Sequence, residues 1–119
     1  LWWSDKFGRG TGYQEDVRLA KKAGLEIDNM HTPVHEQNCL SSNNLDGENI
    51  YQTYRQCVED CASFNIPTMV IHLPTDKYPV NELGLKRLEK IIHNAEDKDV
   101  QIAFENLENV KLLCKPEEI

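Results

Sequence analysis

The feature that most constrains the fold is the alternation of strand-like and helix-like segments along the chain. Three apolar runs of strand length cover residues 25–30, 68–71 and 100–104. Three longer segments carry apolar residues at the helical spacing, and they cover residues 14–23, 48–64 and 81–97. Strands that alternate with helices form parallel sheets through right-handed crossovers. The sequence therefore predicts an α/β fold, and residues 1–3 are interpreted as the tail of a further strand.

The lengths of the connections indicate which edge of the sheet carries function. The connections after the helices are short: Gly24, residues 65–67 and residues 98–99. The connections after the strands are longer and polar, over residues 32–47 and 74–80. Long loops of this kind place functional groups at the carboxyl ends of the strands. Residues 8–12 are rich in glycine but lack the spacing of a dinucleotide-binding turn, so a flexible loop is expected there.

Composition excludes several classes of protein. The 119 residues are 39% hydrophobic and 28% charged, which is typical of one globular domain, here residues 1–119. The net charge of -7 does not favour nucleic-acid binding, and no apolar run approaches the roughly 20 residues that cross a membrane. A small substrate and a cytoplasmic location are expected. Cys57 and Cys61 are interpreted as buried apolar residues in a reducing compartment.

Polar side chains recur where the predicted strands end. His31, His72 and Glu105 each follow an apolar run directly. The carboxyl ends of parallel barrel strands converge on one mouth, and imidazole and carboxylate groups brought together there bind divalent metals. Asn106 is a candidate for orienting Glu105. Trp2 and its neighbour Trp3 face opposite sides in a strand, so one is expected to line the mouth and the other to pack under a helix.

Each of these residues also has a purely structural interpretation. His72 fits a hydrogen-bonded core histidine, and His31 fits an anchor for its own loop. Glu105 fits a solvent-facing residue at a strand end. His35 is expected to be solvated, and His93, on a predicted helix, is expected to have no catalytic role.

Several segments together resemble a known family. They are residues 1–3, 19–27, 31–33, 57–62, 70–72 and 102–107. In order and spacing these segments resemble sugar phosphate isomerase/epimerase proteins of the xylose-isomerase-like TIM-barrel superfamily, which also contains endonuclease IV. The segment Ile102-Ala103-Phe104-Glu105-Asn106-Leu107 matches the most diagnostic stretch. The resemblance covers nearly the whole chain.

The resemblance implies a partial TIM barrel of about four parallel strands with alternating helices. Glu105 would then bind a divalent ion (Mn, Mg, Co or Zn) and act as an acid/base. His72 would line the site, as a catalytic residue and second metal ligand. His31, Trp3 and Asn106 would contact the substrate. The remaining ligands of the family come from strands beyond Ile119, and an earlier N-terminal strand is also expected to be missing.

Three functions follow as hypotheses. The first is a metal-dependent isomerase or epimerase that moves a proton in a sugar or sugar phosphate through an enediolate. The second is a metal-dependent endonuclease that cuts DNA at abasic sites, which the acidic composition disfavours. The third is a non-catalytic partial barrel that binds a sugar or a partner protein. A homo-oligomer is left open in each case.

Overall fold

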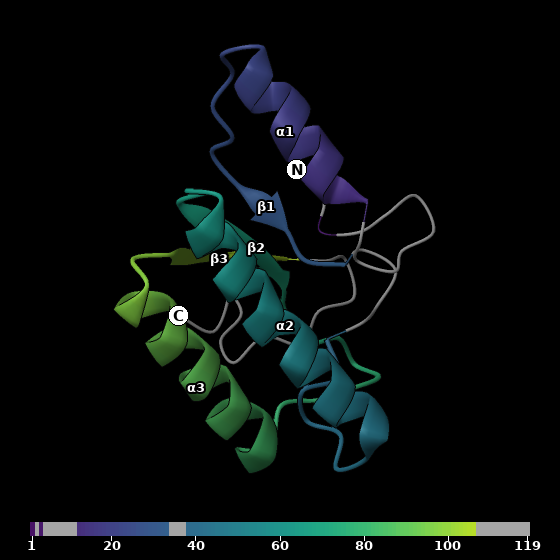
Figure 1. Ribbon diagram of the computed structural model, residues 1–119. Helices are drawn as coiled ribbons and strands as arrows, with labels where there is room; N and C mark the ends of the chain where they lie inside the picture. Colours follow the sequence, from purple (N-terminus) through teal and green to yellow (C-terminus); the bar gives the residue numbers. More distant parts are fainter. Residues whose placement is uncertain (2, 4–11, 34–37, 107–119) are drawn as a thin grey trace.

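The fold combines a parallel sheet with helices, as predicted. The computed structural model describes residues 1, 3, 12–33 and 38–106. Over these residues the elements are α1 (Tyr13–Lys22), β1 (Met30–His31), α2 (Leu45–Ser63), β2 (Thr68–His72), α3 (Glu82–Asp97) and β3 (Gln101–Glu105). The strands pair in parallel in the order β1-β2-β3 (Figure 1). No helix within the described residues is long and apolar enough to span a membrane.

The N-terminal residues extend this sheet beyond β1. The backbone N–H of His31 donates to the carbonyl of Leu1 at 2.7 Å, and the N–H of Trp3 donates to the carbonyl of His31 at 2.8 Å. Bonds that flank one residue in this way are those of a parallel ladder. The interpretation of residues 1–3 as part of a further strand is therefore supported by Leu1 and Trp3.

The first predicted strand is shorter than expected. Residues 25–30 were predicted to form it, but pairing begins only at Met30. Leu25 is 64% exposed, because it lies in the segment that connects the end of α1 to the sheet. A local alternation of apolar and polar residues does not make a strand without a neighbouring strand to pair with.

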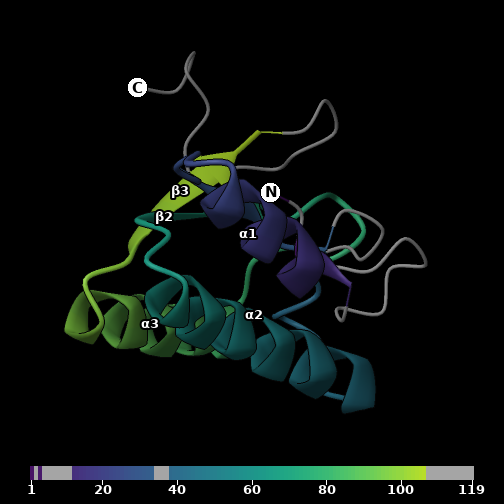
Figure 2. The same ribbon diagram turned by 45° about the horizontal axis from the view of Figure 1, so that its top comes forward.

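The helices cover one face of the sheet. α2 and α3 lie side by side in one layer against β2 and β3, and α1 lies beyond β1 (Figures 1 and 2). Met69 and Ile71 of β2 are fully buried and belong to the core that these helices cover. Thr68, Val70 and His72 alternate with them and are only partly buried. The second face of the sheet is therefore the one available to a functional site.

The strand register places the predicted site residues on that second face. His31 is paired with Val70, and Val70 with Ala103. Two residues further along β2, and so on the same face, His72 is paired with Glu105. Paired residues of parallel strands point to the same side of a sheet. The three polar side chains therefore share the face that the helices leave open.

All three helices end with the same backbone motif. The residue after each C-cap has a positive φ: Gly24 (74°), Asn65 (56°) and Asp99 (59°). The next N–H bonds back to the carbonyl five residues earlier, from Leu25 to Ala20, Ile66 to Cys61 and Val100 to Ala95. These are Schellman motifs, which favour glycine or asparagine at the left-handed position. They explain the short predicted connections, and the prediction that Gly24 follows α1 in this role is confirmed.

Asparagine side chains start the two longer helices. The Asn81 side chain accepts from the N–H of Gly84 at 2.8 Å, which confirms its predicted role as N-cap. Asn44 accepts from the N–H of Gly47 at 3.0 Å, so α2 begins three residues before the predicted Glu48. Gly47 therefore lies inside the first turn of α2 and not in the preceding loop.

Candidate metal centre

Three side chains meet at the carboxyl ends of neighbouring strands. His31 ends β1, His72 ends β2 and Glu105 ends β3. Oε2 of Glu105 lies 2.7 Å from Nε2 of His31 and 3.2 Å from Nε2 of His72. All three possible ligand atoms lie within 4.8 Å of one another, so this His/His/Glu group could hold a metal ion. The predicted convergence of the strand ends is confirmed.

The two histidines of the group are largely buried, whereas its carboxylate is accessible. The side chains of His31 and His72 are only 10% and 13% exposed, whereas that of Glu105 is 48% exposed. The two imidazole rings meet edge to face, with centroids 4.6 Å apart. A molecule arriving from solvent would therefore meet Glu105 before the histidines.

The hydrogen bonds of His31 indicate that a proton or a cation lies between its Nε2 and Oε2 of Glu105. Nδ1 of His31 lies 2.6 Å from the carbonyl oxygen of Thr32, which can only accept, so Nδ1 must carry the hydrogen. A neutral His31 then turns the lone pair of Nε2 toward the carboxylate of Glu105. Two acceptors 2.7 Å apart repel each other unless a proton or a cation lies between them. The geometry is thus that of a cation site as well as of a hydrogen bond.

The surroundings favour the protonation states that bind metals. The hydrogen bond between His31 and Glu105 holds the pKa of Glu105 below its usual range although burial opposes it, and a positive charge on either histidine would act in the same direction as the bond. Burial lowers the pKa of His72, and so does His31, although Glu105 opposes them. A carboxylate and a neutral imidazole are the forms in which these side chains coordinate a metal.

The donor set also fits a metal in spacing. Metal–ligand bonds of about 2.0–2.1 Å in a tetrahedron place ligand atoms about 3.4 Å apart. The observed separations of 2.7 and 3.2 Å are somewhat shorter, so the side chains would open slightly around an ion. The bond from His31 Nδ1 to a backbone carbonyl is the outer contact that metal-binding histidines usually make.

Trp3 lies away from the His/His/Glu group. Its indole Nε1 donates to Oδ2 of Asp60 on α2 at 2.5 Å, and its ring lies 6.0 Å from that of Tyr13 on α1. Since His31 is paired between Leu1 and Trp3, the side chain of Trp3 points to the opposite face of the sheet. Trp3 is thus the tryptophan that packs under helices, and its predicted contact with substrate gains no support. Trp2 lies outside the described residues.

The other polar candidates have varied surroundings. Asn106 follows β3 directly and is exposed, but its side chain takes part in none of the hydrogen bonds within the described residues. Its role in substrate binding therefore stays a prediction. His93 is 81% exposed on α3 beside Glu96, and its lack of a catalytic role stays a prediction. His35 lies outside the described residues.

Sequence reasoning underestimated two residues. The family resemblance assigned His31 to substrate contact and not to the metal, yet His31 lies closer to Glu105 than His72 does. The shared pattern of a histidine two residues before a proline, at His31 and His72, was the available signal. Asn38 was given no role, but its buried side chain donates to the carbonyl of His72 at 2.9 Å. No local pattern marks Asn38, because its partner is 34 residues away.

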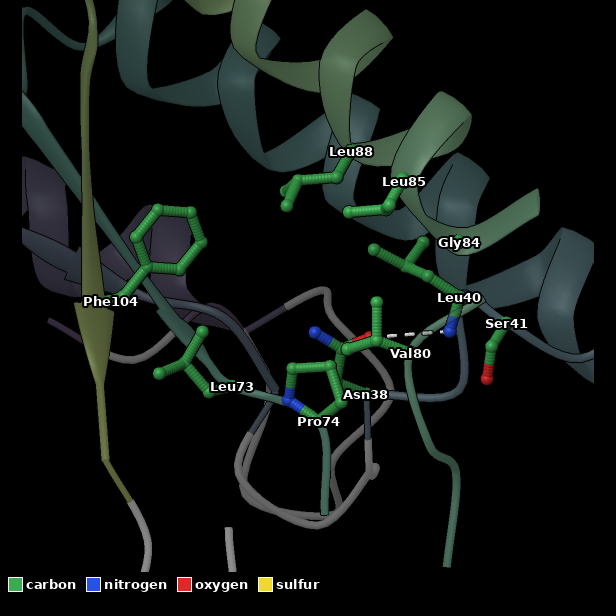
Figure 3. A pocket seen from close by; sticks show the side chains of 10 residues that line it. All are labelled: Asn38, Leu40, Ser41, Leu73, Pro74, Val80, Gly84, Leu85, Leu88 and Phe104. Atoms are coloured by element: carbon green, nitrogen blue, oxygen red, sulfur yellow. Dashed lines mark hydrogen bonds between the residues drawn. The ribbon is translucent and has the colours of Figure 1, made fainter. Parts of the chain in front are cut away.

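A separate apolar pocket lies beside α3. Leu85 and Leu88 of α3 form one wall, and Phe104 of β3 and Leu73 lie opposite them (Figure 3). Phe104 precedes Glu105 on the same strand, so the two side chains point to opposite faces of the sheet. The pocket is therefore on the helix side and is distinct from the His/His/Glu group.

Comparison with known proteins identifies the fold. No family model matches this chain, and no curated protein matches it. The crystal structure of a D-tagatose 3-epimerase-like protein matches 99% of the chain with a TM-score of 0.72 and 18% sequence identity. The chain covers 48% of that protein, which is about half its length. At this level of identity the match shows a shared architecture, and the structure is that of a partial TIM barrel.

Proposed function

We propose that this chain provides the metal-binding strands of a sugar isomerase or epimerase. The observation that carries the proposal is the meeting of His31, His72 and Glu105 at the mouth of a partial TIM barrel. Enzymes of this architecture have their active sites at the carboxyl ends of the strands. The fold shared with an epimerase-like protein supports the same reaction class.

The donor set favours some metals over others. Two imidazole nitrogens and one carboxylate oxygen suit Zn, Co or Mn better than Mg, which prefers oxygen ligands. Three protein ligands leave coordination positions open for substrate oxygens, as in catalytic sites. When bound, the ion would act as a Lewis acid on the sugar carbonyl and so make the neighbouring C–H more acidic.

Within this site Glu105 has two oxygens with different surroundings. Oε2 faces both histidines, whereas Oε1 takes part in none of the hydrogen bonds within the described residues. Oε1 would accept the proton from the carbon next to the carbonyl. The C–H electron pair would form the C=C bond of an enediolate, while the π pair of the carbonyl moves to its oxygen. Return of a proton to the other face of that carbon, or to its neighbour, completes epimerisation or isomerisation. The residue that returns it would come from outside the described residues.

The test begins with the metal content of the purified protein, measured by elemental mass spectrometry. The metal-loaded protein is then incubated with a panel of ketoses and aldoses in D₂O. Exchange of carbon-bound hydrogen, followed by NMR, is the expected result. Glu105→Gln should abolish this exchange, and unchanged exchange in that variant would remove Glu105 from the mechanism. Metal binding without exchange of any sugar would favour the non-catalytic binding hypothesis.

A further inference from the structure

Within the described residues, the pairing of β1 with β2 reaches Val70, two residues before His72. The N–H of Thr32 donates to the carbonyl of Val70 at 3.0 Å. In a parallel ladder the next acceptor on that edge of β2 is the carbonyl two residues later, which belongs to His72. Within the described residues the donor to this carbonyl is a side chain, since Nδ2 of Asn38 donates to it at 2.9 Å.

The orientation of the Asn38 amide is fixed from its other end. Its Oδ1 accepts from the backbone N–H of Leu40 at 3.2 Å, the bond drawn as a dashed line in Figure 3. Asn38 is 4% exposed, so water does not readily replace either bond. Since the oxygen is occupied by a donor, the NH₂ group must face the carbonyl of His72. A carboxylate of the same shape could not make both bonds.

The loop that carries Asn38 is itself fastened to α3. Nδ2 of Asn81 donates to the carbonyl of Ser41 at 2.8 Å. Nη1 of Arg87 donates to the carbonyls of Leu40 and Ser42, each at 2.8 Å. Asn38 therefore connects the end of β2 to a loop that is itself held by hydrogen bonds from Asn81 and Arg87.

The peptide unit that follows His72 is held on both edges. Its carbonyl oxygen accepts from Asn38, and its N–H, which belongs to Leu73, donates to the carbonyl of Glu105 at 3.1 Å. This one peptide unit connects the backbones of His72 and Glu105. Loss of the Asn38 bond would leave a carbonyl without its donor and let the peptide rotate.

We infer that Asn38 is a positioning residue that fixes His72 relative to Glu105 in the metal site. The inference rests on the proposed function, because displacement of His72 changes metal affinity only if His72 binds the metal. Outer contacts of metal ligands typically contribute about ten- to a hundredfold to metal affinity. Asn38 would contribute in this way through the backbone of a ligand.

The test compares Asn38→Asp and Asn38→Ser with Asn81→Asp as a matched control. An aspartate at position 81 still caps α3 but no longer donates to Ser41, while Arg87 still holds the carbonyls of Leu40 and Ser42. The control therefore removes one loop contact and leaves the loop, Asn38 and β2 in place. We expect both Asn38 variants to weaken Co²⁺ binding about tenfold or more and to change its visible absorption spectrum. The control should keep the wild-type spectrum. Wild-type affinity and spectrum in a folded Asn38 variant would overturn the inference.

A second measurement needs no metal. Hydrogen exchange of the Leu73 amide reports how firmly the peptide after His72 is held. Both Asn38 variants should accelerate this exchange relative to Asn81→Asp, and equal exchange would contradict the role of Asn38. If the wild-type protein binds no Co²⁺, the proposed function fails, while the exchange result still decides whether Asn38 holds the strand end.

Discussion

Nε2 of His31 lies 2.7 Å from Oε2 of Glu105, although 74 residues separate them in the chain. Their strands are not neighbours, because β2 lies between β1 and β3. The two side chains therefore meet across the middle strand, beside His72. This contact depends on the register of two separate strand pairs, and it gives the His/His/Glu group its geometry.

Loss of either histidine should weaken metal binding. We expect His31→Ala and His72→Ala each to lower the affinity for Zn²⁺ by about tenfold or more, because each removes one of three ligands. His93→Ala is the control, since that side chain is exposed on α3. Isothermal titration calorimetry of the metal-free protein measures the change. Equal effects of all three substitutions would show that binding does not occur at the His/His/Glu group.

Acidification should lower the free energy of unfolding in two steps, first near the pKa of His72 and then near that of Glu105. The pKa of His72 is lowered in the fold by burial and by His31, so the unfolded chain takes up a proton first as pH falls below about 6.5. The pKa of Glu105 is lowered chiefly by the hydrogen bond from His31, so its contribution is complete above about pH 4.3 and is lost at lower pH. Thermal unfolding followed by circular dichroism should show a falling midpoint from pH 7.5 to 5.5. His72→Gln should flatten this upper step, and a profile parallel to the wild type would exclude His72 as its source.

Gly47 should resist substitution for a steric reason. A Cβ atom there would lie 1.9 Å from the carbonyl oxygen of Ser42. Alanine usually stabilises a helix relative to glycine by about 1 kcal/mol, whereas overpacking costs about 1–3 kcal/mol. Gly47→Ala should therefore lower the free energy of unfolding, measured with urea. Gly84 holds the equivalent position in α3 with its nearest neighbour at 3.2 Å, so Gly84→Ala should cost less; the reverse order would contradict the steric argument.

Cys61 should be unreactive in the folded protein. It is fully buried on α2, and burial together with the charge of Asp60 raises its pKa to about 12. At pH 8 the buried thiol is therefore protonated, whereas the thiolate is the reactive form. Iodoacetamide should modify Cys61 only after unfolding, as read by peptide mass spectrometry. Rapid labelling of the native protein would mean that Cys61 is accessible to solvent and not buried in the core.

Local signals predicted most of the helices. α3 was expected over residues 81–97 and is found at Glu82–Asp97 with Asn81 as its cap, because the cap and the apolar spacing both lie within one segment. The start of α2 was wrong by three residues because Gly47 normally indicates a loop. Glycine is required at this place in the helix because a Cβ atom would clash with the carbonyl oxygen of Ser42, and no sequence pattern reveals that clash.

The site was predictable where topology alone decides it. Parallel strands aim their final residues at one edge, so the meeting of His72 and Glu105 followed from their order along the chain. The short distance from His31 to Glu105 and the bond from Asn38 to His72 required knowledge of strand register and of where the β1–β2 ladder ends. The side of the sheet that Trp3 faces also depended on pairing with His31.

The three Schellman motifs that follow the helices lie at one rim of the sheet, opposite the rim that carries the His/His/Glu group. At the rim where strands begin, the turns are closed by backbone hydrogen bonds and need only a residue that tolerates the left-handed conformation. Those turns do not depend on the long loops at the opposite rim. These turns can therefore keep the order of helices and strands in place even where a loop at the opposite rim changes in length.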